Sequence, residues 1–380
     1  IRKAVFGRVI SSYDYFKGLP MRKYNNRRKR YMFIAAAGVL LLAGCGQKDK
    51  TEIALITDGG TIQDQSVNQS AWEGVEKFSK EFDKTSGYYE PGERSTRGYE
   101  EAINQALEGG AEVIICPGKV FETAVYDMQK EDLSVKFLLL DGVPHAKDSD
   151  REKLRGNAHA VLFSREQAGF LAGYAAVWEG YTNLGFLGGT EDDAAIRYGS
   201  GFVQGANAAA SEKGLNPDQV TIRYRYLGTT AISPAVTKEV EAWYDSGCQV
   251  IFGCDNSILN AIGKAADEKG KLVISAESRL EAFSGSVLTY VENAYEDVVY
   301  QMLKSIEDGE YAGGEKETVG IESTSVGLDM TRSSFQTFTL DQYTMICNKI
   351  KSGELVVAEK NVTKDLAGNK IRNVTVMMEN

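Results

Sequence analysis

The sequence predicts an α/β protein with two lobes, each built on a doubly wound, mainly parallel sheet. From residue 53 onward, short apolar runs alternate with segments of helical periodicity, and this alternation occurs in two successive series. Several apolar runs end at Asp, Asn or Gly. In open α/β sheets, ligands bind at the edge formed by the carboxyl ends of the strands, so these polar residues predict a binding site.

The beginning of the chain differs from the rest in charge and hydropathy. Residues 1–44 hold ten Lys or Arg and one acidic residue, a net charge of +9, whereas the whole chain carries −10. Residues 45–380 therefore carry −19. A basic run at 22–30 precedes an apolar run at 31–43, and this order is typical of a secretory signal. The apolar run is shorter than the roughly 20 residues that a membrane-spanning helix needs.

The apolar run closes with Leu42-Ala43-Gly44-Cys45. This ending resembles a bacterial lipobox, in which the cysteine becomes the lipidated first residue of the mature protein. The alternative is a plain signal peptide with an incidental cysteine. With the lipobox, 45–51 would be a tether, and a lipid on Cys45 would hold the protein at the extracytoplasmic face of the cell membrane. Translation is expected to start at Met21, so 1–20 would take no part in the fold.

The acidic remainder is long enough for two α/β lobes of ordinary domain size. Its negative charge argues against nucleic acid as a partner. The chain has two histidines, and the four cysteines after Cys45 lack the spacing of a disulfide framework or a metal site. We therefore expect buried free thiols, no metal and no cofactor. These cysteines are Cys116, Cys248, Cys254 and Cys347.

The first series contains three strand-to-helix units. Its strands are expected at 53–56, 113–116 and 135–140, and its helices at 68–82, 100–108 and 120–130. Each strand is a continuous apolar run, as in a parallel sheet covered on both faces. Asp58, Gly118 and Asp141 come at or just past the ends of these strands, and right-handed crossovers place such ends along one edge. The polar stretch 88–97 is expected to be a loop or a short edge strand.

The second series repeats this arrangement. Its strands are expected at 159–163, 184–189, 221–227, 250–253 and 272–275, and its helices at 164–178, 196–213, 234–246 and 258–269. Asp255 and Glu277 follow two of these strands. The glycines at 185–189 lack the spacing and the acidic partner of a dinucleotide fingerprint. The remaining elements are expected at 286–290 (strand), 295–308 (helix), 318–328 (strand-like), 342–351 (helix) and 373–377 (strand).

Two similar series followed by a returning segment predict that the chain crosses between the lobes several times. We expect 52–160 and 287–325 in lobe 1, and 161–286 and 326–380 in lobe 2. A small-molecule ligand would then lie in the cleft between the lobes. This is the plan of periplasmic-type binding proteins, which close by a hinge around their ligand.

The stretch 57–74 closely resembles the signature of the basic membrane protein family of lipoproteins, which includes purine nucleoside receptors of ABC transporters. Further matches follow in the same order at 116–118, 135–141, 161–173, 187–189, 201–205 and 326–328. The resemblance implies a type I periplasmic-binding-protein-like fold and a binding role without catalysis. It also implies an ABC transporter permease as the partner of a monomeric, lipid-anchored protein.

The same resemblance assigns ligand contacts to lobe 1. It implies polar contacts from Asp58, Asn68 and Gln69, with Asp141 near the hinge. Asp58, Asn68 and Asp141 could instead cap helices, which is the commoner use of such residues before a turn. The other expected ligand residues of this lobe are Gln63, Asp64, Val67 and Gly118.

In lobe 2 the resemblance implies an aromatic and a carboxylate contact. Tyr198 stands where family members have a Phe stacked on the nucleobase, and base stacking contributes on the order of 1–3 kcal/mol. Glu277 stands where the family usually has an Asp for the ribose hydroxyls, which a carboxylate binds by charge-assisted hydrogen bonds. Asp255 completes the expected set. Tyr198 could instead belong to the core, and Glu277 to the surface.

The sequence departs from the family pattern in three ways. Val67 stands where many members have a second aromatic ring, so one side of a base sandwich is unfilled. Glu292 stands near a position that is often Lys, and Cys254-Asp255-Asn256 replaces a Gly-rich turn. Related members bind other compounds, including riboflavin. We therefore expect a purine nucleoside or a similar heterocyclic solute as the ligand.

Two other functions are alternatives to an ABC importer subunit. One is a surface receptor or adhesin lipoprotein without a transporter. The other is a nucleoside-processing enzyme, which would need a calcium-binding Asp cluster or a nucleophile beside a base. The sequence contains no GxSxG elbow, and neither histidine stands beside a candidate nucleophile. We therefore expect a binding protein and not an enzyme.

Overall fold

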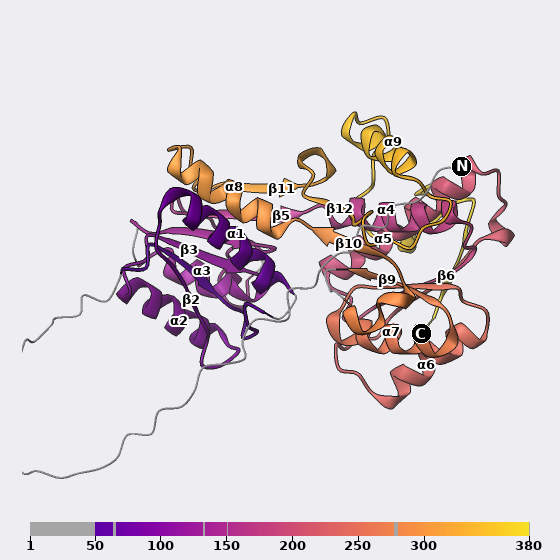
Figure 1. Cartoon of the computed structure of the whole chain (residues 1–380), viewed down its shortest axis with the longest axis horizontal. Coiled ribbons are helices and arrows are strands. Elements are labelled where there is room, and N and C mark those ends of the chain that lie inside the picture. The colour runs from indigo at the N-terminus through magenta and orange to yellow at the C-terminus, as the bar shows by residue number, and fades with distance from the viewer. Residues whose placement is uncertain (1–49, 64–65, 132–133, 150, 277–279, 380) are drawn as a thin grey trace, which may run out of the picture. The chain divides into compact units, whose positions relative to one another are not determined.

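The computed structural model describes residues 50–63, 66–131, 134–149, 151–276 and 280–379. The expectations for Cys45, Asp64 and Glu277 therefore lie outside the described residues. The described chain forms two sheets, each with helices on both faces (Figure 1). This arrangement confirms the predicted class, an α/β protein with two doubly wound, mainly parallel sheets.

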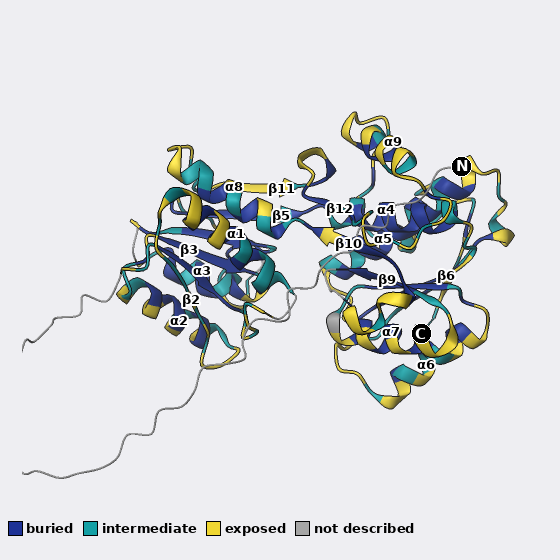
Figure 2. Cartoon of the chain, viewed as in Figure 1, coloured by how far each residue is buried: buried dark blue, intermediate teal, exposed yellow. Residues whose placement is uncertain are grey.

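The first sheet has six strands that all pair in parallel. They are β1 (Ile53–Ile56), β2 (Ser86–Tyr89), β3 (Val113–Pro117), β4 (Lys136–Leu140), β5 (Ala158–Phe163) and β11 (Lys316–Val319). Their spatial order is β11-β5-β4-β3-β1-β2. Its helices are α1 (Val67–Phe82), α2 (Thr96–Glu108), α3 (Glu122–Met128) and α8 (Tyr295–Glu307). Leu55 and Ile115 face α1 and α8, whereas Ile56 and Ile114 face α2 and α3, so both faces are buried (Figure 2).

The second sheet has seven strands in the order β12-β10-β9-β8-β6-β7-β13. They are β6 (Asn183–Gly188), β7 (Thr221–Tyr226), β8 (Val250–Gly253), β9 (Leu272–Ala276), β10 (Val287–Asn293), β12 (Val326–Leu328) and β13 (Thr375–Met378). Only the β10–β12 pair is antiparallel among these described strands. Leu184 and Phe252 face helices α4 and α5, and Leu187 and Ile251 face α6 and α7. The helices are α4 (Arg165–Glu179), α5 (Asp193–Glu212), α6 (Pro234–Asp245), α7 (Asn256–Lys269) and α9 (Leu340–Lys351).

The observed strand pairing corrects three sequence-based expectations. Strand β10 pairs with β9 in the second sheet, although 287–325 was expected in lobe 1. The expected boundary between 160 and 161 falls inside β5, which pairs wholly within the first sheet. The prediction of one strand-like stretch at 318–328 is wrong, because this stretch contains the end of β11 and all of β12, which belong to different sheets. Within this stretch the chain passes from the first sheet to the second, through a turn in which Thr324 has a φ of 58°. The periodicity of the sequence does not show where the chain changes sheets.

Helices α4 and α5 are in contact along four glycines. A Cβ atom on Gly169, Gly173, Gly201 or Gly205 would lie between 1.9 and 2.2 Å from a backbone oxygen of the other helix. Any larger side chain would therefore push the helices apart. The close packing also brings the buried Glu166 of α4 within 2.7 Å of the Arg197 Nε atom on α5. The glycines thus fix the first turn of α4 against the first turns of α5.

The four cysteines after Cys45 are free, but the expectation that all are buried is wrong for Cys254, which is partly exposed just after β8. Cys116, Cys248 and Cys347 are buried, and burial raises the pKa of Cys248 to about 12, which keeps it an unreactive thiol at neutral pH. No helix within the described ranges combines the length and apolar character needed to cross a membrane. Those ranges also hold no group of three or more His, Cys, Asp or Glu side chains that could bind a metal ion.

His159 gives the first sheet a pH-dependent stability. Its ring is buried in β5, and burial lowers the pKa of His159, while the carboxylates of Glu317 and Glu315 oppose this shift in part. The unfolded chain therefore binds a proton near pH 6.5 that the folded chain binds only at lower pH. Stability must fall as the pH drops below about 6.5, by at most about 1.4 kcal/mol per pH unit from this group.

His159→Phe is expected to reduce this loss of stability, because phenylalanine fills the same space against Tyr311 and cannot be protonated. Urea denaturation of both proteins between pH 5 and pH 7.5 measures the difference. Equal pH slopes for the two proteins would contradict the assignment to His159.

Candidate functional site

Three predicted ligand residues lie at the carboxyl edge of the first sheet. Asp58, Gly118 and Asp141 follow β1, β3 and β4, which are neighbouring parallel strands. Gly118 has a φ of 135°, a conformation that favours glycine, and its N–H donates to the Leu140 oxygen at 2.9 Å. Asp141 has a φ of 60°, which is uncommon for a residue with a side chain. Such local strain often marks a functional position.

Asp58 and Asn68 hold each other by two hydrogen bonds. The Asn68 side chain donates to the Asp58 carboxylate at 2.7 Å, and the Asp58 N–H donates to the Asn68 side-chain oxygen at 3.2 Å. The carboxylate also accepts from the Gly60 N–H at 2.9 Å. The N-cap of α1 is Ser66, so neither Asp58 nor Asn68 caps that helix. The pair instead ties the loop after β1 to the first turn of α1.

Asp141 belongs to a buried ion pair. Its Oδ1 atom lies 2.8 Å from the Nη1 atom of Arg165, and the two side chains are 9% and 13% exposed. Its Oδ2 atom accepts a hydrogen bond from the Tyr295 hydroxyl. Arg165 Nη2 also donates to that hydroxyl, at 3.2 Å. Asp141, Arg165 and Tyr295 therefore form a closed ring of polar contacts.

Tyr198 joins this ring through two contacts. It is 2% exposed, and its hydroxyl accepts a hydrogen bond from the buried Asn293 side chain at 3.2 Å. The Arg165 guanidinium carbon lies 5.7 Å from the centroid of the Tyr198 ring, and Phe252 packs edge-on against the same ring. Stacking of a nucleobase on Tyr198 stays a prediction.

The other predicted ligand residues take different positions. Asp255 caps α7, because its carboxylate accepts from the Ser257 and Ile258 N–H groups at 3.0 and 3.3 Å. Burial raises the pKa of Asp255, although these hydrogen bonds oppose the shift. Gln69 donates to Glu73 at 2.9 Å, and Gln63 is exposed. Contact of Asp255, Gln69 and Gln63 with a ligand stays a prediction.

Glu292 forms an ion pair with Arg332, which follows β12. Arg332 pairs with both Glu292 and Asp329. Its guanidinium carbon also lies 4.8 Å from the centroid of the Tyr290 ring. Glu292 at the end of β10 is therefore paired with a cation, although Glu292, Asp329 and Arg332 together keep a net charge of −1.

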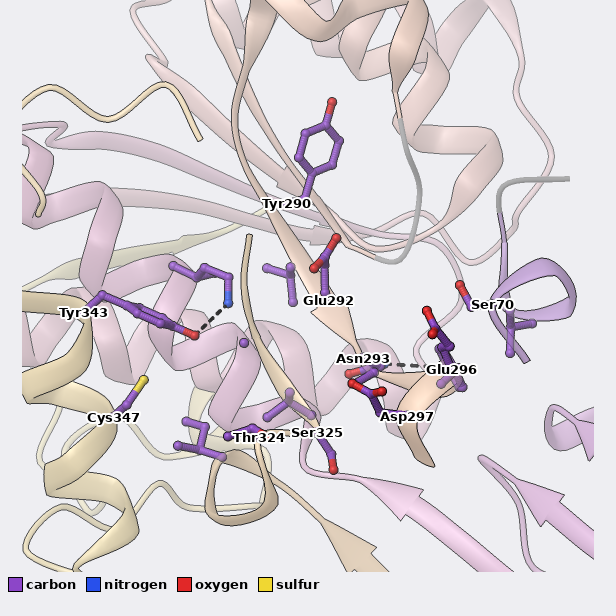
Figure 3. Close-up of a pocket in the computed structure, with 18 of the residues that line it drawn as sticks. Ser70, Tyr290, Glu292, Asn293, Glu296, Asp297, Thr324, Ser325, Tyr343 and Cys347 are labelled. Carbon is purple, nitrogen blue, oxygen red and sulfur yellow. Dashed lines mark hydrogen bonds between the residues drawn. The ribbon is translucent and has the colours of Figure 1, made fainter. Parts of the chain in front are cut away.

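A pocket of about 480 Å³ (Figure 3) has one member of the ring, Tyr295, in its lining. It is lined by the start of α1, the junction of β10 and α8, β12 and α9. Figure 3 shows Tyr343 and Cys347 on one side of it and Ser70 and Glu296 on the other. Among the described residues of the predicted ligand set, only Val67 lines it. The pocket is therefore distinct from most of that set, although Asn293 and Tyr295 are common to the pocket and the polar network.

Sequence reasoning missed Arg165, Asn293 and Tyr295. Each lies at a junction where a strand passes into a helix, which is the same signal that identified Asp58 and Asp141. Asn293 contacts Tyr198 across 95 residues of the chain, and Tyr295 contacts Asp141 across 154, whereas Arg165 lies nearer in the chain but in another strand-to-helix unit. The local pattern alone does not show which junctions meet.

Glu122 supports the loop that carries Asp141. Its carboxylate accepts from the Val143 N–H at 3.0 Å and lies 3.2 Å from His145 Nε2. Glu122→Ala is expected to lower stability by about 1–3 kcal/mol and to weaken ligand binding, because the Val143 N–H loses a charged acceptor. Glu122→Gln keeps an acceptor oxygen and should have a smaller effect. Calorimetric unfolding and ligand titration of both variants measure this, and equal effects would contradict it.

Two mainly parallel sheets with polar side chains at their carboxyl edges, linked by several crossings of the chain, are the architecture of the periplasmic-binding-protein-like fold class. The fold is similar to that of an ABC transporter solute-binding protein from Aeropyrum pernix K1, with a TM-score of 0.65 at 17% identity over 84% of this chain and 97% of that one. Residues 50–361 match the Bmp family, described as ABC transporter substrate-binding protein PnrA-like. The chain belongs to this family and is a substrate-binding protein, not an enzyme.

Two relatives extend over most of the chain. The ABC transporter nucleoside-binding protein BmpA of Lactococcus lactis is 26% identical over 332 residues, which cover 79% of this chain and 90% of the relative. The CD4+ T-cell-stimulating antigen of Listeria monocytogenes is 25% identical over 364 residues, which cover 87% of this chain and 97% of the relative. The predicted family is confirmed.

Proposed function

We propose that this protein is the lipid-anchored, extracytoplasmic substrate-binding subunit of an ABC importer for a purine nucleoside or a similar heterocyclic solute. Family membership supports the transporter role, and the name of the Lactococcus lactis relative supports the nucleoside. The observation that carries the ligand class is the arrangement at the carboxyl edge of the first sheet. There, Asp58 is held by Asn68, and Asp141 is held by Arg165.

This edge suits an uncharged ligand with several hydrogen-bond donors. Arg165 balances the charge of Asp141, so the ligand does not have to supply a cation. Carboxylates accept strong hydrogen bonds from sugar hydroxyls and from the N–H groups of a heterocycle. A nucleoside carries both kinds of donor. A phosphate group would instead be repelled by Asp58.

A thermal-shift panel of nucleosides, nucleobases, riboflavin and sugars tests this proposal. A ligand present at 100 times its dissociation constant should stabilise the protein by roughly 2.7 kcal/mol. We expect a rise in unfolding temperature with at least one purine nucleoside, and none with the matching monophosphate. Absence of a shift with every nucleoside would refute the nucleoside part of the proposal.

The anchor and the partner are separate parts of the proposal. The lipid would be attached to Cys45, and the permease of the importer would receive the ligand from a monomeric binding protein. Cys45→Ala in the full chain should release the protein from the membrane fraction, and light scattering should give the mass of one chain. Membrane retention of the Cys45→Ala protein would contradict the lipid anchor.

A surface receptor without a transporter is the second candidate. It is favoured by one observation, the similarity to a Listeria monocytogenes protein named as a T-cell-stimulating antigen. The two functions differ in uptake. Deletion of the gene should reduce import of a labelled nucleoside if the protein serves an importer, and should leave import unchanged if it is only a receptor.

A further inference from the structure

Arg165 contacts two residues of the predicted ligand set that come from different sheets. Its Nη1 atom lies 2.8 Å from the Asp141 carboxylate, which follows β4 of the first sheet. Its guanidinium carbon lies 5.7 Å from the centroid of Tyr198, which lies on α5 against the second sheet. Arg165 itself is the first residue of α4, directly after the chain leaves β5. One side chain thus connects both parts of the predicted site.

The contacts fix the orientation of the Asp141 carboxylate. Arg165 engages its Oδ1 atom, and the Tyr295 hydroxyl donates to its Oδ2 atom. Arg165 Nη2 donates to the same hydroxyl at 3.2 Å, so the guanidinium also orients Tyr295. Tyr295 is the first residue of α8, directly beyond the end of β10. The ring therefore includes two of the segments in which the chain passes between the sheets.

The chemistry of this position requires arginine. The Asp141 and Arg165 side chains are largely removed from water, and removal of one partner of a buried ion pair leaves an uncompensated charge. The planar guanidinium can donate in two directions and lie against an aromatic ring at the same time. Lysine would supply the charge without this fixed geometry.

We propose that Arg165 is the positioning residue of the ligand site, holding Asp141 and Tyr198 in the arrangement that binds the ligand. This inference rests on the proposed function, because it takes Asp141 and Tyr198 as ligand contacts. Arg165 acts through these two residues. Its contact with Tyr295 makes their arrangement depend on the segment that joins β10 to α8.

Four variants and one matched control test the proposal. They are Arg165→Met, Arg165→Lys, Asp141→Asn, the Arg165→Met/Asp141→Asn double variant, and Arg225→Met as the control. Arg225 forms an ion pair of similar length with Glu239, at 2.7 Å, which is more exposed than the Arg165 pair and lies on β7, outside the network. Titration calorimetry with adenosine, guanosine and inosine measures affinity. Hydrogen exchange of residues 141–143 without ligand measures the order of the loop.

Arg165→Met is expected to weaken nucleoside binding roughly 10- to 100-fold, the usual range for loss of a charged hydrogen-bond partner. Exchange at 141–143 should become about tenfold faster, and Arg225→Met should change neither quantity. Arg165→Lys should recover part of the affinity. The double variant should bind no more weakly than the poorer single variant, since the two side chains act as one unit.

Wild-type affinity together with wild-type exchange in Arg165→Met would overturn the proposal, and so would additive losses in the double variant. If Arg165→Met does not fold, Arg165→Lys decides: reduced affinity supports the positioning role, and unchanged affinity overturns it. If the unmodified protein binds none of the three nucleosides, the nucleoside part of the proposed function fails. The exchange measurement then decides the positioning role alone, because it needs no ligand.

Discussion

Gly205→Val is expected to lower the free energy of unfolding by about 3 kcal/mol, because overpacking at a site with no free space is strongly destabilising. A Cβ atom on Gly205 would lie 1.9 Å from the backbone oxygen of Phe170, and backbone cannot rotate out of the way as a side chain can. The helices α4 and α5 would have to separate. Their separation would also move Arg165 away from Tyr198, so ligand binding should weaken as well.

Urea denaturation measures the effect of Gly205→Val, with Gly205→Ala as a graded variant that should lose less stability. Gly92→Val is the control, because no atom beyond the two neighbouring residues in the chain lies within 4 Å of a Cβ atom at Gly92. The control is expected to change stability by less than about 0.5 kcal/mol. If Gly205→Val and Gly92→Val had the same stability, the close packing of α4 on α5 would not matter energetically.

Asp58→Asn is expected to weaken nucleoside binding by up to about 100-fold, equivalent to a loss of about 3 kcal/mol. The amide keeps an oxygen that can accept from Gly60 and contact Asn68, so the fold of the loop should survive. Only the negative charge is removed. A large loss of affinity with little loss of stability would therefore mean that the ligand is bound by a charge-assisted hydrogen bond.

Asp58→Ala is the comparison variant in which the loop itself is destabilised. It removes the carboxylate that accepts from the fully buried Asn68 NH2 group, while the backbone N–H at residue 58 still donates to the Asn68 oxygen. Loss of a charged acceptor costs about 1–3 kcal/mol, so this variant should lose stability as well as affinity. Asp341→Ala, which removes an exposed acid on α9, is the control for net charge. Titration calorimetry and thermal unfolding measure the two quantities. Wild-type affinity in Asp58→Asn would exclude Asp58 as a ligand contact.

Much of the fold could be predicted from local sequence. The apolar runs of β1, β3 and β4 are continuous because both faces of the sheet are covered, and such runs are visible in the sequence. Because Asp58 and Asp141 directly follow two of these strands, they were expected at the same edge of the sheet. The observed pairing places β1 and β4 in one parallel sheet, as this expectation requires. The local sequence pattern does not show which of the two sheets a strand joins. The assignments of β10 and β12 could therefore not be predicted.

The site was predictable only in part for the same reason. Asn68 could be associated with Asp58 because both lie in one short strand-to-helix unit. The contacts of Asp141 with Arg165 and Tyr295 join different strand-to-helix units, and Tyr295 is separated from Asp141 by 154 residues. Asp255 shows the opposite case. It follows a strand like Asp58, yet its carboxylate caps a helix, and the sequence pattern is the same for both roles.

Titration calorimetry of the mature protein with adenosine, guanosine and inosine, at two temperatures, tests the central claim most directly. The account predicts saturable binding of one molecule per chain with micromolar or tighter affinity, about −8 kcal/mol or more favourable, for at least one of the three. The same nucleoside should bind poorly to Asp58→Asn. Absence of binding for all three nucleosides, with saturable binding of a solute that lacks both a sugar and a heterocycle, would contradict the account.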